Sequence, residues 1–328
     1  MLQDEVLALL KGQEGPRSGE EMSQVLGVSR AAVWKAIRAL RENGYTISSA
    51  PNRGYRLEDS PDRISAGELA GALKGRTLGR ELLCLDEIDS TNSEVKRRAM
   101  EGAAEGLVIL ADRQTGGRGR RGRTFLSPAG KGLYMSVLLR PRTGLRELMW
   151  LTAWTGVAVC DGIQRACGVR PGIKWTNDII LDGRKVCGIL TELGMEETDR
   201  PEYVVVGMGI NVSQTAEDFG PEVAPVAVSL TQALGTAPRR AALAAAVLTA
   251  LDERYAAFPR EKERCLEQYR RDCVTLGKEV RLIRGGEERT AFAEEIDEDF
   301  QLVVRLPDGR RETVNAGEVS VRGLLGYM

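Results

Sequence analysis

Residues 116–123 consist of four glycines and four arginines, and they interrupt the middle of the chain. Ordering glycine costs conformational entropy and clustered guanidinium groups repel one another, so this arginine loop favours neither a helix nor a strand. The residues on either side, 107–111 and 133–139, are apolar runs typical of buried strands. We therefore expect a loop between two strands of a compact domain, and we expect it to be mobile while no ligand is bound.

The composition of the arginine loop indicates a ligand. Exposed backbone N–H groups and planar guanidinium groups both suit phosphate and carboxylate oxygens. The alternative is an arginine-glycine linker that contacts nucleic acid without specificity. The place of the arginine loop between two strands favours a binding site, because functional loops are held by rigid elements.

Histidine is absent from all 328 residues. Its absence excludes Ser-His-Asp catalysis, His-ligated metals and imidazole acid–base chemistry. An enzyme with this sequence would work by positioning and charge, with Lys, Arg, Asp and Asn side chains.

The remaining composition indicates a cytoplasmic protein of two or three domains. The six cysteines are scattered without a Cys-x-x-Cys pair, as in proteins with reduced thiols and no structural zinc. No signal peptide and no run of 18 apolar residues occurs, so we expect no membrane insertion. A net charge of −1 means that any DNA contact must come from a local patch.

Residues 1–60 show the pattern of a winged helix-turn-helix. Apolar residues at helical spacing predict three helices, and a hairpin of residues 45–57 would form the wing. Basic and acidic residues number eight each, but the basic ones gather in the third helix and the wing. A small helical domain for protein contacts is the alternative. The segregation of charge favours DNA, bound by a dimer at a two-part operator, with contacts from Ser29, Arg30, Lys35, Arg38 and Arg53.

Residues 61–272 alternate between strand-like and helix-like segments, which predicts an α+β domain with a mixed sheet. Strands are expected at 82–88, 107–114, 133–139, 172–175, 179–181, 186–192 and 203–206. Helices are expected from 94, and at 146–167, 240–258 and 260–272. Gly207 and Gly209 lack the third glycine of a dinucleotide fingerprint, and they indicate a close backbone approach or a bulge.

Residues 273–328 contain five short strand-like segments separated by turn residues. They predict a small SH3-like barrel, either a packing cap or a domain with a part in binding.

Five motifs together resemble the bifunctional biotin protein ligase and biotin operon repressor family of bacteria. They are Asp-Ser-Thr-Asn at 89–92, Gly-Arg-Gly-Arg-Arg-Gly at 117–122, Lys-Trp-Thr-Asn-Asp at 174–178, Arg-Lys-Val-Cys-Gly at 184–188 and Gly-Met-Gly-Ile-Asn at 207–211. The resemblance spans nearly the whole chain. It implies a central domain like those of class II synthetases and biotin–lipoate ligases.

The resemblance implies that biotin and ATP, with Mg²⁺, form biotinoyl-5′-AMP and pyrophosphate. Biotin then passes to a lysine of a biotin carboxyl carrier protein. The intermediate would also be the corepressor, favouring a homodimer on the operator of biotin genes. Implied catalytic residues are Lys185, Arg120 and Asp178, the last holding or deprotonating the incoming lysine. Implied ligand-binding residues are Ser90, Thr91, Asn92, Gln114, Gly117, Arg118, Gly119, Arg120, Arg121, Arg123, Lys174, Asn177, Lys185, Gly188 and Asn211.

Within this set the resemblance assigns separate roles. Ser90, Thr91 and Gln114 would bind the ureido ring of biotin. Arg121 and Arg123 would face phosphates, while Lys174, Asn177 and Asn211 would handle nucleotide and Mg²⁺.

Two positions depart from the family pattern. Thr176 stands where Pro is usual, and Phe125 where Trp often follows the arginine loop.

Two other functions stay open: a regulator that senses a small ligand without catalysis, and a lipoate-type acyl ligase. The lipoate family commonly carries a histidine in its signature, which this chain lacks.

Overall fold

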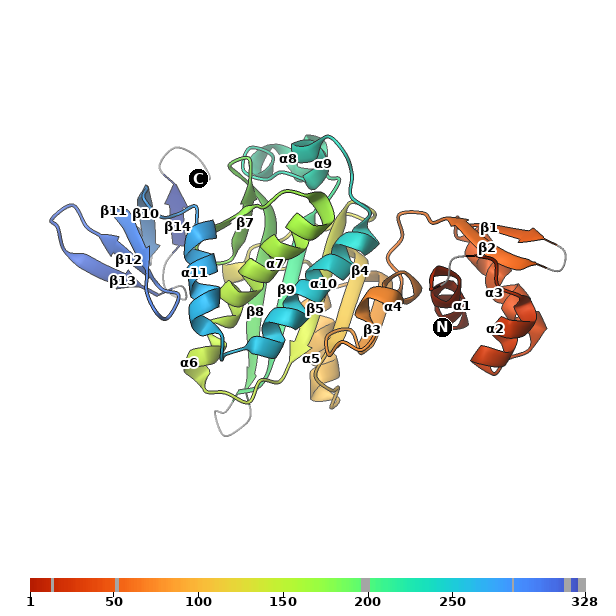
Figure 1. Ribbon diagram of the computed structural model, residues 1–328. Helices are drawn as coiled ribbons and strands as arrows, with labels where there is room; N and C mark the ends of the chain where they lie inside the picture. Colours follow the sequence, from red (N-terminus) through yellow and green to blue (C-terminus); the bar gives the residue numbers. More distant parts are fainter. Residues whose placement is uncertain (13–14, 51–52, 196–200, 285, 316–319, 324–328) are drawn as a thin grey trace.

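The computed structural model describes residues 1–12, 15–50, 53–195, 201–284, 286–315 and 320–323. Three sheets follow one another along the chain (Figure 1): a hairpin, a seven-stranded mixed sheet and a five-stranded antiparallel sheet. This confirms the multidomain α+β class. The boundaries 1–60, 61–272 and 273–328 stay predictions. Within the described residues, no helix combines the length and apolar character needed to cross a bilayer.

The N-terminal part is a helix-turn-helix followed by a hairpin, as predicted. It comprises α1 (Leu2–Lys11), α2 (Gly19–Leu26), α3 (Arg30–Glu42), β1 (Thr46–Ala50) and β2 (Gly54–Asp59). Gly27 makes the turn between α2 and α3 with a φ of 66°, a conformation that favours glycine. Val6, Met22 and Val33 form the centre of a separate small core. Pro51 and Asn52, at the predicted tip of the wing, lie outside the described residues.

The seven-stranded sheet carries the rest of the architecture. Only its β3–β4 pair is parallel, and the other pairs are antiparallel. Its strands run in the order β3-β4-β5-β9-β8-β7-β6. Their bounds are β3 (Glu81–Ile88), β4 (Leu107–Gln114), β5 (Gly132–Leu139), β6 (Gly172–Lys174), β7 (Asp178–Leu181), β8 (Arg184–Met195) and β9 (Pro201–Asn211).

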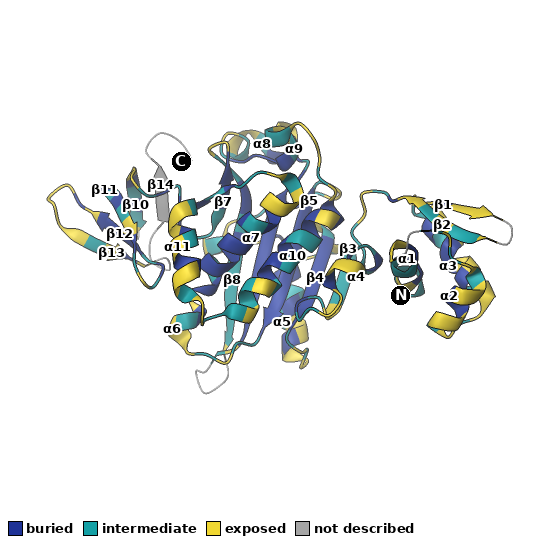
Figure 2. Ribbon diagram, in the orientation of Figure 1, coloured by how far each residue is buried: buried dark blue, intermediate teal, exposed yellow. Residues whose placement is uncertain are grey.

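Helices cover both faces of this sheet. Successive strand residues point to opposite faces, so Val108 and Leu110 of β4 join the main core. Leu107 and Ile109 instead pack with α5 (Thr91–Met100) in a smaller cluster. The main core contains α7 (Leu151–Cys167) and α10 (Arg240–Ala257), which lie in front of the sheet in Figure 1. Figure 2 shows the strands between the helices as the most continuously buried part of the molecule.

Two helix predictions need correction. The helix predicted from 94 begins at Thr91, because the Ser90 hydroxyl caps it by accepting from the N–H of Ser93. The single helix predicted over 146–167 is two, α6 (Leu145–Leu148) and α7. A turn interrupts them where the buried Trp150 contacts Phe300, with ring centroids 6.2 Å apart. Three helices were not predicted: α4 (Ala66–Leu73), α8 (Ala216–Val223) and α9 (Leu230–Leu234).

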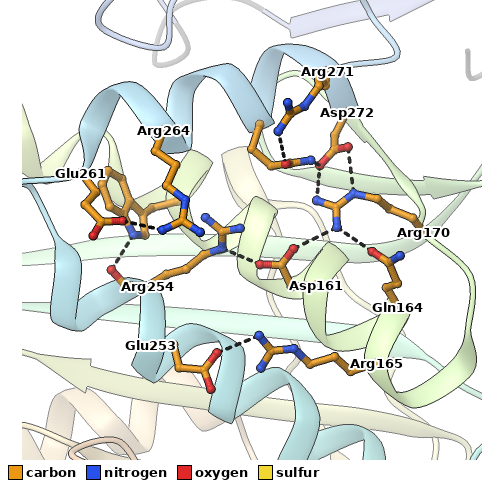
Figure 3. Close-up of polar contacts among 12 residues, drawn as sticks. Asp161, Gln164, Arg165, Arg170, Glu253, Arg254, Glu261, Arg264, Arg271 and Asp272 are labelled. Atoms are coloured by element: carbon orange, nitrogen blue, oxygen red, sulfur yellow. Dashed lines mark hydrogen bonds and ion pairs between the residues drawn. The ribbon is translucent and has the colours of Figure 1, made fainter.

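Charged side chains fasten α7, α10 and α11 (Lys262–Asp272) to one another (Figure 3). Asp161 of α7 accepts from Arg254 of α10 at 2.6 Å and from Arg170 at 2.9 Å. Arg170 also pairs with Asp272 of α11. Since every arginine drawn has an acceptor, this cluster is a structural clamp.

The C-terminal sheet has the order β13-β12-β11-β10-β14. It consists of β10 (Glu279–Arg284), β11 (Glu287–Ile296), β12 (Leu302–Arg305), β13 (Arg311–Val314) and β14 (Ser320–Gly323). All five strands were predicted, as was the turn at Gly309, where φ is 86°. Buried Val280, Ala293 and Val304 join the main core, so this sheet packs as part of the larger body.

Candidate active site

A cleft of about 470 Å³ opens beside the arginine loop. It is bounded by the start of α5, the end of β4, the arginine loop, strands β8 and β9, and the turn that joins β6 to β7. Its lining residues are Ser90, Thr91, Asn92, Gln114, Arg118, Gly119, Arg120, Phe125, Asn177, Lys185, Gly188, Ile189, Leu190, Gly207, Met208 and Gly209. All five predicted motifs therefore contribute to the lining, the motif at 174–178 through Asn177 alone.

Polar groups gather at the α5 end of the cleft. The N–H and hydroxyl of Thr91 donate to Gln114 Oε1 at 2.9 and 3.1 Å. The Gln114 amide donates in turn to Ser127 Oγ at 2.9 Å. This network holds the Gln114 side chain in one orientation. It leaves Ser90, at the helix start, beside it in the lining.

Asn92 is also part of the cleft lining, and hydrogen bonds hold its side chain. Its Nδ2 donates to Glu192 at 2.8 Å, and its Oδ1 accepts from Ser136 Oγ at 2.6 Å. A side chain at Gly207 would collide with it. Since both ends of its amide are engaged, the geometry favours a supporting role for Asn92. Ser127 and Ser136 were missed, although Ser136 interrupts an apolar strand and so offered a signal.

The arginine loop closes into a hairpin. Gly119 N–H donates to Arg123 O at 2.7 Å and Phe125 N–H donates to Gly117 O at 2.9 Å. A short 3-10 turn, Arg120–Gly122, forms its tip. A Cβ at Gly117 would lie 2.7 Å from Ser127 Oγ, so only glycine fits there. Loop mobility without a ligand stays a prediction.

The four arginines of the loop differ in position. Arg118 and Arg120 line the cleft, whereas Arg121 and Arg123 are exposed and outside its described lining. Arg120 Nη1 donates to Thr176 Oγ1 at 2.9 Å and to Asn177 Oδ1 at 2.8 Å. Burial lowers the pKa of the Arg120 guanidinium from its ordinary value, while Asp178 opposes this shift.

Lys185 is the third cation of the lining. Its Nζ lies 2.6 Å from Asp178 Oδ1. Its backbone is clamped between the carbonyl of Val226 and the N–H of Val228, at 2.8 and 2.9 Å. A Cβ at Gly188 would come within 2.9 Å of the Lys185 ammonium, so glycine leaves that ammonium room.

Five predicted ligand residues lie outside the described lining: Gly117, Arg121 and Arg123 of the arginine loop, and Asn211 and Lys174. Asn211 is buried, and its Nδ2 donates to the carbonyls of Lys185 and Val228 at 3.3 Å each. It therefore supports the strand that carries Lys185. Lys174 is 4% exposed and lies opposite Asp178 in the β6–β7 register.

Apolar residues complete the cleft. Phe125 stands over Gly209, where a Cβ would lie 2.6 Å from its ring, and it meets Tyr134 edge-on with centroids 6.3 Å apart. Ile189, Leu190 and Met208 extend this apolar surface and were not predicted. The two glycines of the β9 motif thus allow the close approach anticipated from the sequence.

The charged residues of this lining, Arg118, Arg120 and Lys185, are all basic. Such a cleft can bring a carboxylate and a polyphosphate together, because fixed cations offset their repulsion. Among the described residues, no group of three Asp, Glu, Cys or His side chains could hold a metal.

A second candidate surface lies on α3. Arg30, Lys35 and Arg38 are exposed there, and Arg53 is exposed on the wing. Ser29 caps the helix, with Oγ accepting from Ala32 N–H at 3.2 Å. Arg30 and Arg38 have acidic neighbours, Glu20 and Glu42. All five predicted DNA-contacting residues lie in α3, its cap or the wing.

Three family models match the chain in order. They are "HTH domain" over residues 3–56, "Biotin/lipoate A/B protein ligase family" over 85–211 and "Biotin protein ligase C terminal domain" over 275–322. Fold and cleft thus define a ligase domain joined to a DNA-binding module.

The chain is similar to known biotin ligases over most of its length. The bifunctional ligase/repressor BirA of Bacillus spizizenii is 42% identical over 238 residues, 73% of each chain. That of Escherichia coli is 30% identical over 97% of this chain and 96% of its own. A biotin protein ligase from Aquifex aeolicus, solved with biotin and ATP, covers 74% of this chain and 99% of its own, with a TM-score of 0.64 and 30% identity. The chain belongs to the biotin protein ligase family, in its bifunctional ligase/repressor branch.

Proposed function

We propose that this protein joins biotin to AMP from ATP, and then transfers biotin to one lysine of a biotin carboxyl carrier protein. The observation that carries the proposal is the cleft itself. It places the polar Thr91–Gln114 pair and an apolar floor next to Arg118, Arg120 and Lys185. This arrangement suits a ligand that has a polar ring, an apolar chain and a carboxylate. That carboxylate must meet a phosphate.

In the first step the biotin carboxylate attacks the α-phosphorus of ATP, the P–O bond to the β-phosphate breaks and pyrophosphate leaves. Ser90, Thr91 and Gln114 orient the ureido ring, which fixes the position of the carboxylate. Lys185, Arg118 and Arg120 reduce the repulsion between the two anions and stabilise the developing charge. The closed arginine loop excludes water from the mixed anhydride.

Mg²⁺ prefers oxygen ligands and is usually bound through substrate phosphates. The described residues fit that mode, because they offer Asp178 and Asn177 oxygens near the cleft and no three-residue metal cluster. When bound, the ion would supply further neutralisation of the phosphates.

In the second step the carrier lysine attacks the anhydride carbonyl and AMP leaves. The lysine ammonium loses one proton before it attacks and a second as the amide forms, and Asp178 or solvent takes them up. Asp178 already holds the ammonium of Lys185, and it can hold the incoming lysine in the same way.

We also propose that biotinoyl-5′-AMP is the corepressor of a homodimer on the operator of biotin genes, in the cytoplasm. Support comes from the exposed basic residues of α3 and the wing. By linkage, the adenylate must bind the dimer-competent state more tightly than the monomer.

The ligase proposal is tested by incubating the protein with biotin, ATP, Mg²⁺ and an apo-carrier domain. Mass spectrometry should find one biotinylated lysine, and none if ATP is omitted or that lysine is replaced by arginine. Pyrophosphate release without any product on the carrier would contradict the transfer step. No pyrophosphate at all would favour a ligand sensor, and product with lipoate in place of biotin would favour the acyl-ligase alternative.

Repression is tested by gel shift with DNA from upstream of biotin genes. Addition of biotin with ATP should retard the DNA further. Equal mobility with and without these ligands would leave only the ligase.

A further inference from the structure

The Arg120 guanidinium attaches the arginine loop to the β6–β7 turn. We propose that Thr176 is a positioning residue that latches Arg120, and with it the arginine loop, over the cleft. The effect on a bound intermediate rests on the ligase function proposed above, but the latch of the empty protein does not.

The geometry of Arg120 supports the latch. A guanidinium Nη atom carries two hydrogens, and Arg120 Nη1 has two acceptors, Thr176 Oγ1 at 2.9 Å and Asn177 Oδ1 at 2.8 Å. Both distances are those of good hydrogen bonds. Because the Arg120 side chain is partly buried, losing an acceptor leaves a charged donor short of a partner.

The turn that provides these acceptors is held from several sides. Trp175 donates through its backbone N–H to Thr275 Oγ1 at 3.0 Å, and through its indole to Phe300 O at 2.9 Å. The carbonyl of Thr176 accepts from Tyr269 Oη at 3.3 Å. The acceptor is therefore fixed to α11 and the C-terminal sheet.

Asn177 is fixed as well. Its Nδ2 donates to Ile189 O at 2.9 Å, and Ile189 N–H donates to Asn177 O at 2.9 Å. The donor, in contrast, belongs to a segment that is half glycine, whose backbone has more freedom to move. Opening of the loop should then be limited by the bonds that Arg120 makes.

The Thr176 hydroxyl distinguishes this chain from the usual pattern of the family. Proline, the residue usual at this position in the family, has no hydroxyl to accept from Arg120. The departure at 176 therefore adds a polar contact.

The latch can be tested on the empty protein with trypsin, which cleaves after arginine. Cleavage of a folded loop requires local opening. Thr176→Val keeps the shape of the side chain and removes the hydroxyl, and it should raise the cleavage rate after Arg118, Arg121 and Arg123 about tenfold, the usual worth of one such bond. Thr176→Ser keeps the hydroxyl and should match the parent.

The second measurement is retention of the adenylate. After incubation with biotin, ATP and Mg²⁺, rapid gel filtration should find a half-life of bound biotinoyl-5′-AMP about tenfold shorter for Thr176→Val than for Thr176→Ser. In the Arg120→Gly background the two Thr176 variants should behave alike, because the latch has lost its donor. A merely structural role for Thr176 would still separate them.

Equal trypsin rates for the parent and Thr176→Val would overturn the latch. If Thr176→Val does not fold, judged by circular dichroism, Thr176→Ala replaces it, with the same expected rates. If the parent forms no adenylate, the ligase proposal fails, and the trypsin comparison still decides the latch.

Discussion

At the scale of single residues, the structure holds the cation of Lys185 in a defined position in the cleft. Asp178 holds its ammonium, the 226–228 segment clamps its backbone, and Gly188 leaves it space. Such preorganisation is what stabilisation of a developing charge requires.

Replacing Lys185 with glutamine removes this charge while keeping most of the side-chain volume. We expect the rate of pyrophosphate release to fall about 10²- to 10³-fold, the range for one preorganised donor. The exposed Lys278→Gln is the control and should retain the parental rate. A fall of less than about threefold would contradict a role for Lys185 in the first step.

A substitution at Arg120 can distinguish formation of the intermediate from its retention. Arg120→Gly removes the bonds to Thr176 and Asn177 and leaves Lys185 in place. We expect pyrophosphate release to continue at a reduced rate, because Arg118 and Lys185 remain in the cleft. Biotinoyl-5′-AMP should escape, so that a bystander protein such as serum albumin becomes biotinylated. Labelling confined to the carrier lysine would show that the loop does not retain the intermediate.

At the scale of elements, α3 carries an exposed residue, Trp34, that the charge pattern of the sequence did not indicate as a DNA contact. Trp34 is 51% exposed and lies between Arg30 and Arg38 at a spacing of four residues, so all three share a face. An exposed aromatic side chain on a recognition helix suits a thymine methyl group or a sugar.

Trp34→Ala should weaken operator binding about tenfold, as expected for one lost base contact. Biotinylation of the carrier should be unchanged, since α3 lies in a separate core. Val25→Ala on α2 removes another exposed apolar side chain and serves as the control in fluorescence anisotropy titrations. Equal affinities for all three proteins would exclude Trp34 from the interface.

At the scale of the whole molecule, Arg240 joins parts that are far apart in the sequence. It is 4% exposed, and it donates to Asp62 at 2.8 Å and to Asp112 of β4 at 2.6 Å. Its neighbour Arg239 is exposed and pairs with Asp59 at the end of the wing hairpin. Together they connect the start of α10 to the end of the wing hairpin and to the residues that follow it.

The two adjacent arginines make a matched comparison. Arg240→Met removes a buried partner of two carboxylates and should lower the free energy of unfolding by about 2 to 4 kcal/mol. Arg239→Met breaks an exposed pair and should cost at most about 1 kcal/mol. Urea titration followed by tryptophan fluorescence measures both, and equal midpoints would refute this role of Arg240.

Local patterns in the sequence were enough to predict the order of elements and most of the site. Strand 107–114, strands 179–181 and 186–192, and the three N-terminal helices follow from side-chain periodicity within a few positions. Ser90, Arg118, Arg120 and Lys185 lie in ordered motifs, Gln114 ends a predicted strand, and the cleft contains them all.

Only the tertiary structure decided which contacts join distant segments. Ser136 reaches Thr91 across 45 positions, Arg120 reaches Thr176 across 56 and Arg240 reaches Asp62 across 178. No local pattern encodes such pairs, because they depend on how the sheet orders its strands and where the helices pack. For the same reason the sequence did not show that Asn211, predicted beside the nucleotide, donates to the backbone carbonyls of Lys185 and Val228.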